Sequence, residues 1–169
     1  YFSSKPIIFD VGAHIGETTH LYNDIFYNCI IHTFEPNPEY FKNLNNEVSK
    51  FNNNNNNEIY THQVALGNKE EVKKYNKYSN PILSGFFKIK NHRLNKDGKF
   101  VKLLDTLNVK TETGDVFCAK NKIDTIDFLK INVQGFEPEV LLGFEEMLNN
   151  SKINLILVEF DYTGRYERK

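Results

Sequence analysis

The chain begins its first regular pattern with Pro6-Ile-Ile-Phe-Asp-Val-Gly-Ala-His-Ile-Gly-Glu-Thr-Thr19. Pro6 to Val11 is a short apolar run rich in β-branched residues, which is typical of a strand buried in a parallel sheet. Gly12 and Gly16 then form a glycine turn. The residues that follow, up to about Asn28, predict a helix whose spacing buries Leu21, Tyr22, Ile25 and Phe26.

Strand-like and helix-like segments alternate along the rest of the chain. Apolar runs predict strands at residues 29–34, 58–66, 126–133 and 153–158. Asn37-Pro38 predicts a helix start, because Asn is a good N-cap and Pro suits the first helical position, and Pro138 predicts another. The apolar faces of these helices would be Tyr40, Phe41, Leu44, Val48 and Phe51, and Val140, Leu141, Phe144 and Leu148. We therefore expect a Rossmann-like α/β fold, with a mostly parallel, twisted sheet and helices on both faces.

Composition limits the class of protein. The chain has 169 residues, 40% hydrophobic and 25% charged, which predicts one globular domain over residues 1–169. No window approaches the roughly 18 apolar residues of a membrane span, so we expect no membrane partner. The net charge of -1 argues against a nucleic-acid partner. Cys29 and Cys118 have no metal-ligand spacing, and we expect buried, reduced thiols in a cytoplasmic protein without a metal site.

Two segments interrupt the regular alternation. The Asn run at residues 52–57 is of low complexity, and we expect a solvated loop without a chemical role. Residues 67–122 mix Lys, Tyr and Asn with short apolar runs, which predicts strands or hairpins joined by long loops. Long loops in a compact domain often form lids or binding sites, so this variable region is expected to bind the substrate.

The start of the chain has the layout of a nucleotide site. In parallel α/β sheets ligands lie beyond the carboxyl ends of the strands, near the point where the strand order reverses. Gly12 and Gly16 would let the backbone approach a ligand closely. Glu35 follows Gly12 by 23 residues, near the ~20 expected of an acid that accepts both hydroxyls of a ribose.

Two familiar nucleotide sites do not fit this turn. A dinucleotide fingerprint starting at Gly12 would need glycines at the third and sixth positions, where His14 and Glu17 stand. No Gly-Lys-Ser/Thr follows either, so the turn is not a P-loop. Asp10 before a Gly-x-x-x-Gly turn suits a ligand with a cationic amino-acid end and no pyrophosphate.

Four blocks of sequence together resemble the FkbM family of class I methyltransferases, which use S-adenosylmethionine. The blocks are Phe9-Asp-Val-Gly-Ala-His-Ile-Gly-Glu-Thr-Thr19, Thr33-Phe-Glu-Pro-Asn-Pro38, Val64-Ala-Leu-Gly67 and Phe128-Leu-Lys-Ile-Asn-Val-Gln-Gly-Phe-Glu137. They occur in the family's order. The resemblance implies methylation of a hydroxyl on a small molecule or glycan, such as a sugar or a related metabolite.

The resemblance also implies roles for individual residues. The methionine end of the cofactor would be lined by Asp10, Gly12, Ala13, His14 and Gly16. Glu35 would hold the ribose, with Phe34 and Pro36 beside the adenosine. Ala65, with Val64 and Leu66, would flank the adenine. The methyl-transfer pocket would be faced by the candidate catalytic residues Lys130, Asn132 and Gln134.

The fourth block departs from the family pattern, which usually reads Lys-Ile-Asp-Val-Glu-Gly. Here Asn132 and Gln134 replace both carboxylates, and an amide cannot act as a general base. Three explanations remain open. The base lies elsewhere, with His92, Glu159 and Asp161 as candidates; transfer relies mainly on positioning; or the domain binds its cofactor without turnover. An ion pair with a strand-end acid would equally explain Lys130.

The chain also ends soon after Glu159, where class I methyltransferases normally add a helix and two antiparallel strands. Either the C-terminal strands are truncated, or the sheet is completed differently. An incomplete sheet would leave an exposed edge, so we expect a homodimer or a neighbouring domain of a longer chain. Two hypotheses follow: an S-adenosylmethionine-dependent O-methyltransferase, or a catalytically weak or inactive cofactor-binding module of a larger carbohydrate-processing protein.

Overall fold

The computed structural model describes residues 3–51, 55–90, 100–160 and 164–167, and its centre is a parallel sheet. The sheet has five strands in the order β3-β2-β1-β7-β8, and each neighbouring pair runs parallel. The strands are β1 (Ile7–Val11), β2 (Ile30–Phe34), β3 (Glu58–His62), β7 (Phe128–Ile131) and β8 (Ile156–Val158). The order reverses between β1 and β7, which is where a ligand crevice is expected.

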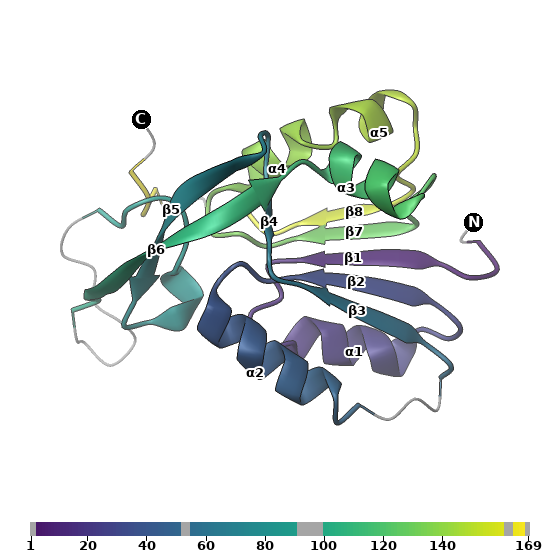
Figure 1. The fold of residues 1–169 in the computed structure, drawn as a ribbon, viewed down its shortest axis with the longest axis horizontal. Coiled ribbons are helices and arrows are strands. Elements are labelled where there is room, and N and C mark those ends of the chain that lie inside the picture. The colour runs from purple at the N-terminus through teal and green to yellow at the C-terminus, as the bar shows by residue number, and fades with distance from the viewer. Residues whose placement is uncertain (1–2, 52–54, 91–99, 161–163, 168–169) are drawn as a thin grey trace.

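Helices cover both faces of this sheet (Figure 1). One face carries α1 (Glu17–Ile25) and α2 (Pro38–Val48), and the other carries α3 (Gly114–Asn121), α4 (Glu137–Leu142) and α5 (Glu145–Asn149). The two cores follow from the alternation of side chains along a strand. Ile8 of β1 packs in the cluster that holds Tyr22 of α1, whereas Phe9 packs with Phe117 and Phe144 on the other side. This confirms the predicted Rossmann-like α/β fold.

A second, smaller sheet lies across the carboxyl ends of the parallel strands (Figure 1). Its order is β4-β6-β5, formed by β4 (Ala65–Leu66), β5 (Glu71–Tyr78) and β6 (Leu103–Glu112). β5 and β6 pair antiparallel, and the short 3-10 helix η1 (Pro81–Leu83) follows β5. The predicted hairpin character of residues 67–122 is therefore correct. Helix α3 in this region was not predicted; Thr113 caps its start by accepting the Val116 N–H at 3.2 Å.

The single strand predicted at residues 58–66 is wrong. It is divided into β3, which pairs with β2, and β4, which pairs with β6 of the second sheet. Gln63 and Val64 carry the chain from one sheet to the other. An apolar run shows that a segment is buried, but it does not show which sheet buries it. The predicted strands at 126–133 and 153–158 exist as the shorter β7 and β8.

The predicted buried face of the first helix is wrong at Leu21 and Ile25, which are each 54% exposed. Tyr22 is buried as predicted, and Phe26, just beyond the helix, packs partly buried against the same core. The other buried residues of the helix are Thr19 and Asn23. The cause is the Thr19 hydroxyl, which donates to the buried Asp10 carboxylate at 2.7 Å and so fixes the rotation of the helix. The helix also ends at Ile25 instead of continuing to about residue 28. The start of α2 is as predicted, because the Asn37 side chain accepts the Glu39 N–H at 3.0 Å.

The helix predicted from Pro138 through Leu148 is two helices. α4 begins one residue earlier, at Glu137, and the chain bends at Gly143 before α5. A Cβ on Gly143 would lie 2.0 Å from the Gly67 carbonyl oxygen, so the bend is pressed against the turn after β4. This contact joins the helix layer to the second sheet.

The Asn-rich segment has a structural role that the sequence analysis did not predict. Asn57 is buried; its Oδ1 accepts the Cys29 N–H at 3.1 Å, and its Nδ2 donates to the carbonyls of Asn23 and Phe26 at 3.0 Å. The Asn55 amide donates to the Asn23 carbonyl as well. The end of this run therefore satisfies the carbonyls at the C-terminus of α1. Residues 52–54 lie outside the described part.

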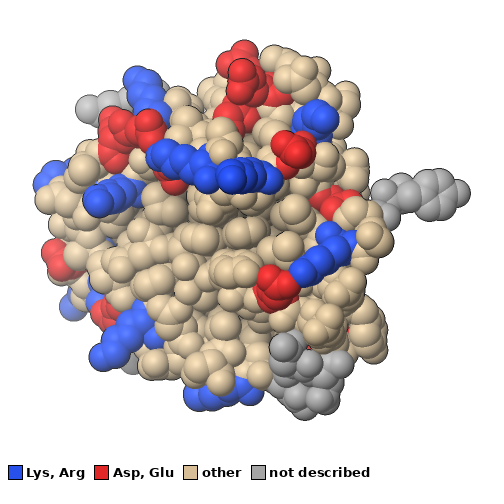
Figure 2. Space-filling view, turned by 45° about the vertical axis from the view of Figure 1, so that its right-hand side comes forward, with Lys and Arg blue, Asp and Glu red and all other residues tan. Residues whose placement is uncertain are grey.

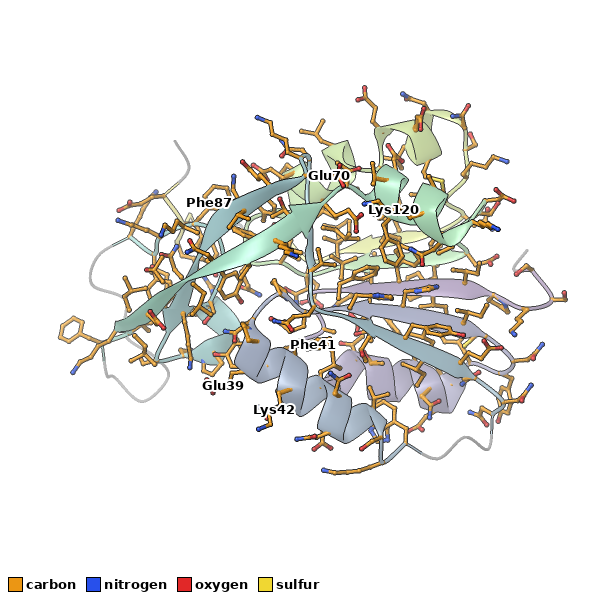
Figure 3. All side chains as sticks on the ribbon, viewed as in Figure 1. Glu39, Phe41, Lys42, Glu70, Phe87 and Lys120 are labelled. Carbon is orange, nitrogen blue, oxygen red and sulfur yellow. The ribbon has the colours of Figure 1, made fainter. Side chains whose placement is uncertain are left out.

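Ion pairs tie the second sheet to the helices. Lys77 of β5 pairs with Glu39 of α2, and Lys120 of α3 pairs with Glu70 at 3.0 Å (Figure 3). On the face seen in Figure 2, acidic and basic side chains lie close to one another around a broad uncharged area. Within the described residues, no helix is both long and apolar enough to span a bilayer.

Candidate active site

A cavity lies where β1, β2 and β7 end, beneath the second sheet. Its walls come from the turn after β1, the end of β2, the residues of β4 and the end of β7. Most of the predicted cofactor residues line it, namely Gly12, Ala13, His14, Phe34, Glu35, Pro36 and Ala65. Lys130, Asn132 and Gln134 also line it. The tertiary structure therefore brings residues from all four sequence blocks to one place.

Asp10 and Gly16 were predicted to contact the cofactor, but they do not line the cavity. Asp10 is fully buried, and its Oδ1 accepts a hydrogen bond from the Lys130 ammonium at 2.8 Å. Its Oδ2 accepts the Thr19 hydroxyl proton at 2.7 Å. Gly16 opens α1 with φ +97°, and a Cβ there would meet Leu44 at 2.9 Å. Both residues therefore stabilise the turn after β1 from outside the cavity.

Lys130 is 3% exposed, and its ammonium is committed to Asp10 and, at 3.3 Å, to the Gly12 carbonyl. A buried lysine needs such a partner. The pair joins β1 to β7 at the point where the strand order reverses. Its position favours a structural role for Lys130 over a catalytic one, which is the alternative that the sequence left open.

Gly12 shows why the turn after β1 requires glycine. Its φ is +82°, and a Cβ would lie 2.0 Å from the Asn132 carbonyl oxygen. The N–H groups of Gly12 and Ala13 both donate to the Phe34 carbonyl, at 3.1 and 3.0 Å. The turn is therefore held between the ends of β2 and β7, and it forms a fixed wall of the cavity.

Glu35 is a buried carboxylate at the end of β2, only 4% exposed. Its Oε2 accepts the His14 N–H at 3.0 Å, and its Oε1 accepts the Asn37 N–H at 2.8 Å. Burial raises the pKa of Glu35 to about 8, and the two backbone hydrogen bonds counter part of that rise. Each oxygen keeps a further lone pair, which suits a ligand with two neighbouring hydroxyl groups.

His14 follows the glycine turn with φ 53°, and its ring packs edge-on against Tyr40 with centroids 4.7 Å apart. Its Nδ1 lies 3.5 Å from the Glu17 carboxylate. Its Nε2 is buried and has no hydrogen-bond partner among the described residues. A buried polar atom in this state, beside Glu35, is where a bound ligand or water would supply the missing bond.

The two amides at the end of β7 belong to a chain of hydrogen bonds. Tyr166 donates from its hydroxyl to the Gln134 Oε1 at 2.9 Å, and the Gln134 Nε2 donates to the Asn132 Oδ1 at 2.8 Å. The Asn132 Nδ2 then donates to the Glu159 Oε2 at 2.9 Å. Glu159 follows β8, so this chain of bonds joins three separate segments of the protein.

The turn that presents Gln134 is clamped by Glu137. The Oε1 of Glu137 accepts the N–H groups of Val133 and Gly135, at 3.1 and 3.0 Å. Gln134, between them, has φ 57°, a conformation that costs about 1 kcal/mol or more for a side chain other than glycine. Glu137 is fully buried, so this turn is rigidly defined.

One wall of the cavity comes from β5, η1 and the residues just after η1. It consists of Tyr75, Pro81, Ile82, Ser84 and Phe86, all from the variable region. No motif marks these residues individually, although residues 67–122 as a whole were expected to bind the substrate. Tyr166 was missed as well, because nothing local to the C-terminal segment points to Gln134. The candidate bases His92 and Asp161 lie outside the described residues.

Comparison with known families agrees with the geometry. The model of the methyltransferase FkbM domain matches residues 10–169. No curated protein and no solved structure matches the chain. The family match spans nearly the whole chain, and the parallel sheet with its cavity at the switch point is the fold that such a domain requires. The chain therefore belongs to the FkbM methyltransferase family.

Proposed function

We propose that the protein is an S-adenosylmethionine-dependent O-methyltransferase whose acceptor is a hydroxyl of a sugar or a related small metabolite. The observation that supports this most is Glu35. It stands at the end of β2, beside the cavity and the glycine turn, with both oxygens held by backbone N–H groups. A carboxylate oriented in this way is suited to a ribose diol.

The rest of the cavity fits the same methyl donor. Val64, Ala65 and Leu66 form an apolar wall suited to a flat purine. Among the described lining residues, Lys130 is the only lysine or arginine, and it is already paired with Asp10. The wall therefore suits a nucleoside without a pyrophosphate. When bound, S-adenosylmethionine supplies a methyl group on a positively charged sulfur.

The protein's own residues would align the methyl donor with the acceptor and exclude water from them. The turn after β1 and the second sheet enclose the donor end of the cavity, which excludes water. Asn132 and Gln134 present amide groups to the acceptor end, where they can orient a neutral hydroxyl compound. Fixing two reactants in line lowers the barrier of a transfer that the sulfonium already favours.

Calorimetric titration with S-adenosylmethionine tests the donor site. We expect saturable binding by the wild type and at least tenfold weaker binding by Glu35→Ala, because the ribose hydroxyls lose their acceptor. Glu145→Ala is the matched control; Glu145 is exposed on α5 and should leave binding unchanged. Transfer of a labelled methyl group to a panel of methyl glycosides and polyols then tests the acceptor class. Absence of donor binding would refute the proposal.

A second candidate function is a cofactor-binding module without turnover. The two amides in place of the family's usual carboxylates favour it. Under this hypothesis, Asn132→Asp combined with Gln134→Glu should create methyl transfer where the wild type has none. Equal turnover by wild type and double variant would exclude the module.

A further inference from the structure

The hydrogen-bond chain at the acceptor end has one direction. Every donor points from Tyr166 through Gln134 and Asn132 toward Glu159, over distances of 2.9, 2.8 and 2.9 Å. A tyrosine hydroxyl can donate, each amide can accept at oxygen and donate at nitrogen, and an ionised carboxylate can only accept. The last acceptor is a Glu159 oxygen, so the direction of the bonds is compatible with a negatively charged Glu159.

Compared with the usual family pattern, the carboxylate lies after β8 instead of after β7. The family's usual acids at positions 132 and 134 are amides here. Among the four hydrogen-bonded residues Tyr166, Gln134, Asn132 and Glu159, only Glu159 carries a carboxylate. The Tyr166 end is buried, at 5% exposure, whereas the Glu159 end is exposed. Glu159 does not itself line the cavity, but it contacts Asn132, which does.

The other described carboxylates near the cavity are engaged in different contacts. Asp10 is buried in its pair with Lys130, and Glu35 is held by two backbone N–H groups. Glu137 clamps the turn before α4. Glu17 lines the cavity from the start of α1, beside His14 and away from β7. Glu159 is the one that lies beside the amides at the acceptor end.

We propose that Glu159 takes the proton of the acceptor hydroxyl, and that Asn132, Gln134 and Tyr166 are positioning residues that hold its carboxylate. This inference rests on the proposed function. As the acceptor oxygen forms its bond to the methyl carbon, the carbon–sulfur bond breaks and leaves its electron pair on sulfur. The hydroxyl proton passes to a Glu159 oxygen. On this proposal, Asn132 and Gln134 hold a general base that lies at Glu159 instead of at positions 132 or 134, so the two amides do not mean that the base is missing.

Methyl transfer to the glycoside and polyol panel tests the role of Glu159. We expect Glu159→Gln to lower kcat by about 100-fold or more, as for loss of a general base, and to keep S-adenosylmethionine binding unchanged. The wild-type kcat should rise with pH as Glu159 ionises, and Glu159→Gln should lose that limb. Tyr166→Phe should lower kcat less, about threefold to tenfold. Glu145→Gln is the same chemical change on exposed α5 and should have no effect.

A second measurement needs no acceptor. The side-chain amide signal of Asn132 in a ¹⁵N spectrum should shift with pH as Glu159 is protonated, and Tyr166→Phe should move the Gln134 amide signal. Glu159→Gln should abolish the pH-dependent shift, whereas Glu145→Gln should keep it. An Asn132 signal that ignores pH, or that titrates unchanged in Glu159→Gln, would overturn the inference.

The outcomes separate the two proposals. Loss of donor binding by the wild type refutes the methyltransferase site itself. Donor binding with unchanged kcat in Glu159→Gln refutes only the base. Turnover by Asn132→Asp/Gln134→Glu on acceptors that the wild type leaves untouched also refutes the base, because Glu159 then fails to replace the carboxylates. If neither the wild type nor this double variant methylates the panel, the pH dependence of the Asn132 amide signal tests the inference about Glu159.

Discussion

Lys130 and Asp10 neutralise each other in a buried pair between β7 and β1. Removing one partner of such a pair leaves an uncompensated buried charge, whereas replacing both can be nearly neutral. We therefore predict that Lys130→Met lowers the free energy of unfolding by about 3–5 kcal/mol, measured by urea denaturation. Asp10→Asn combined with Lys130→Met should recover most of this loss.

The control for that pair is a lysine at the surface. Lys50 pairs with Glu47 on α2, and its side chain is 65% exposed. Lys50→Met should barely move the urea midpoint, because exposed ion pairs contribute little. Equal effects of the Lys130 and Lys50 substitutions would contradict a structural role for the buried pair.

Glu35 should make ribose binding depend on pH. Its pKa is raised to about 8 by burial, so the free protein holds it protonated at neutral pH. A protonated carboxyl accepts two hydroxyl protons less well, so affinity should rise with pH up to about 8 and then level off, by at most about tenfold per unit. Adenosine is the probe, because it carries the ribose and titrates outside this range.

Calorimetry at pH 6.5, 7.5 and 8.5 would measure this rise. The matched variant is Glu35→Gln, which keeps the shape and removes the titration. It should bind adenosine weakly and equally at all three values. A wild-type affinity that does not change with pH would show that the Glu35 charge is not used in binding.

At the scale of elements, Asn57 joins the end of α1 to the start of β2. Its side chain accepts a hydrogen bond from the Cys29 N–H and donates to the carbonyls of Asn23 and Phe26. Asn57→Ala leaves these buried groups without that partner, which should cost about 2–3 kcal/mol of unfolding free energy in urea. Asn56→Gly is the control within the same run: Asn56 is exposed with φ 54°, which glycine tolerates. A similar loss in both variants would argue against the cap.

The pair His32 and His62 links β2 to β3. The His32 Nδ1 lies 3.0 Å from the His62 Nε2, and both rings pack against Phe117. Burial lowers the pKa of each histidine to about 4. Unfolding returns these groups to their usual pKa near 6.5, so the unfolded chain binds more protons between these values.

This pair should therefore make the fold sensitive to acid. The stability that it contributes is fully present above about pH 6.5 and is lost as pH falls toward 4, on the order of 3 kcal/mol for each histidine. Urea unfolding at pH 7, 6, 5 and 4 would measure the slope. His62→Phe keeps the ring stack and removes one titrating group, so its slope should be about half as steep. His20→Gln, at an exposed histidine of α1, should leave the slope unchanged.

At the scale of the whole molecule, Gly143 holds the helix layer against the second sheet. Its φ of -72° is ordinary, so the need for glycine is steric: a Cβ would lie 2.0 Å from the Gly67 oxygen. Gly143→Ala should lower the unfolding free energy by about 3 kcal/mol or more. At Gly164 a Cβ meets nothing within 4 Å, so Gly164→Ala should cost only its φ strain, about 1 kcal/mol. A harmless Gly143→Ala would show that the two layers are not held together at this point.

The sheet also keeps an open edge, as the sequence predicted. β8 pairs with β7 and with no other described strand, and Leu155 and Leu157 are about half exposed. On α1, Leu21 and Ile25 are exposed to a similar degree. The edge strand β8 and helix α1 therefore leave apolar side chains uncovered.

Local pattern was enough for much of this protein. The apolar runs of β1, β2, β7 and β8, the glycine turn and the Asn37-Pro38 cap each depend on neighbouring residues, so the sequence predicts the parallel sheet and Glu35 at the end of β2. Tertiary structure decided the rest. The rotation of α1 depends on the buried bond between Thr19 and Asp10, and the division of residues 58–66 depends on β6, far along the chain. The bonds from Tyr166 to Gln134 and from Asn132 to Glu159 join segments about 30 residues apart. Such contacts depend on how the whole core packs, which no short sequence pattern encodes.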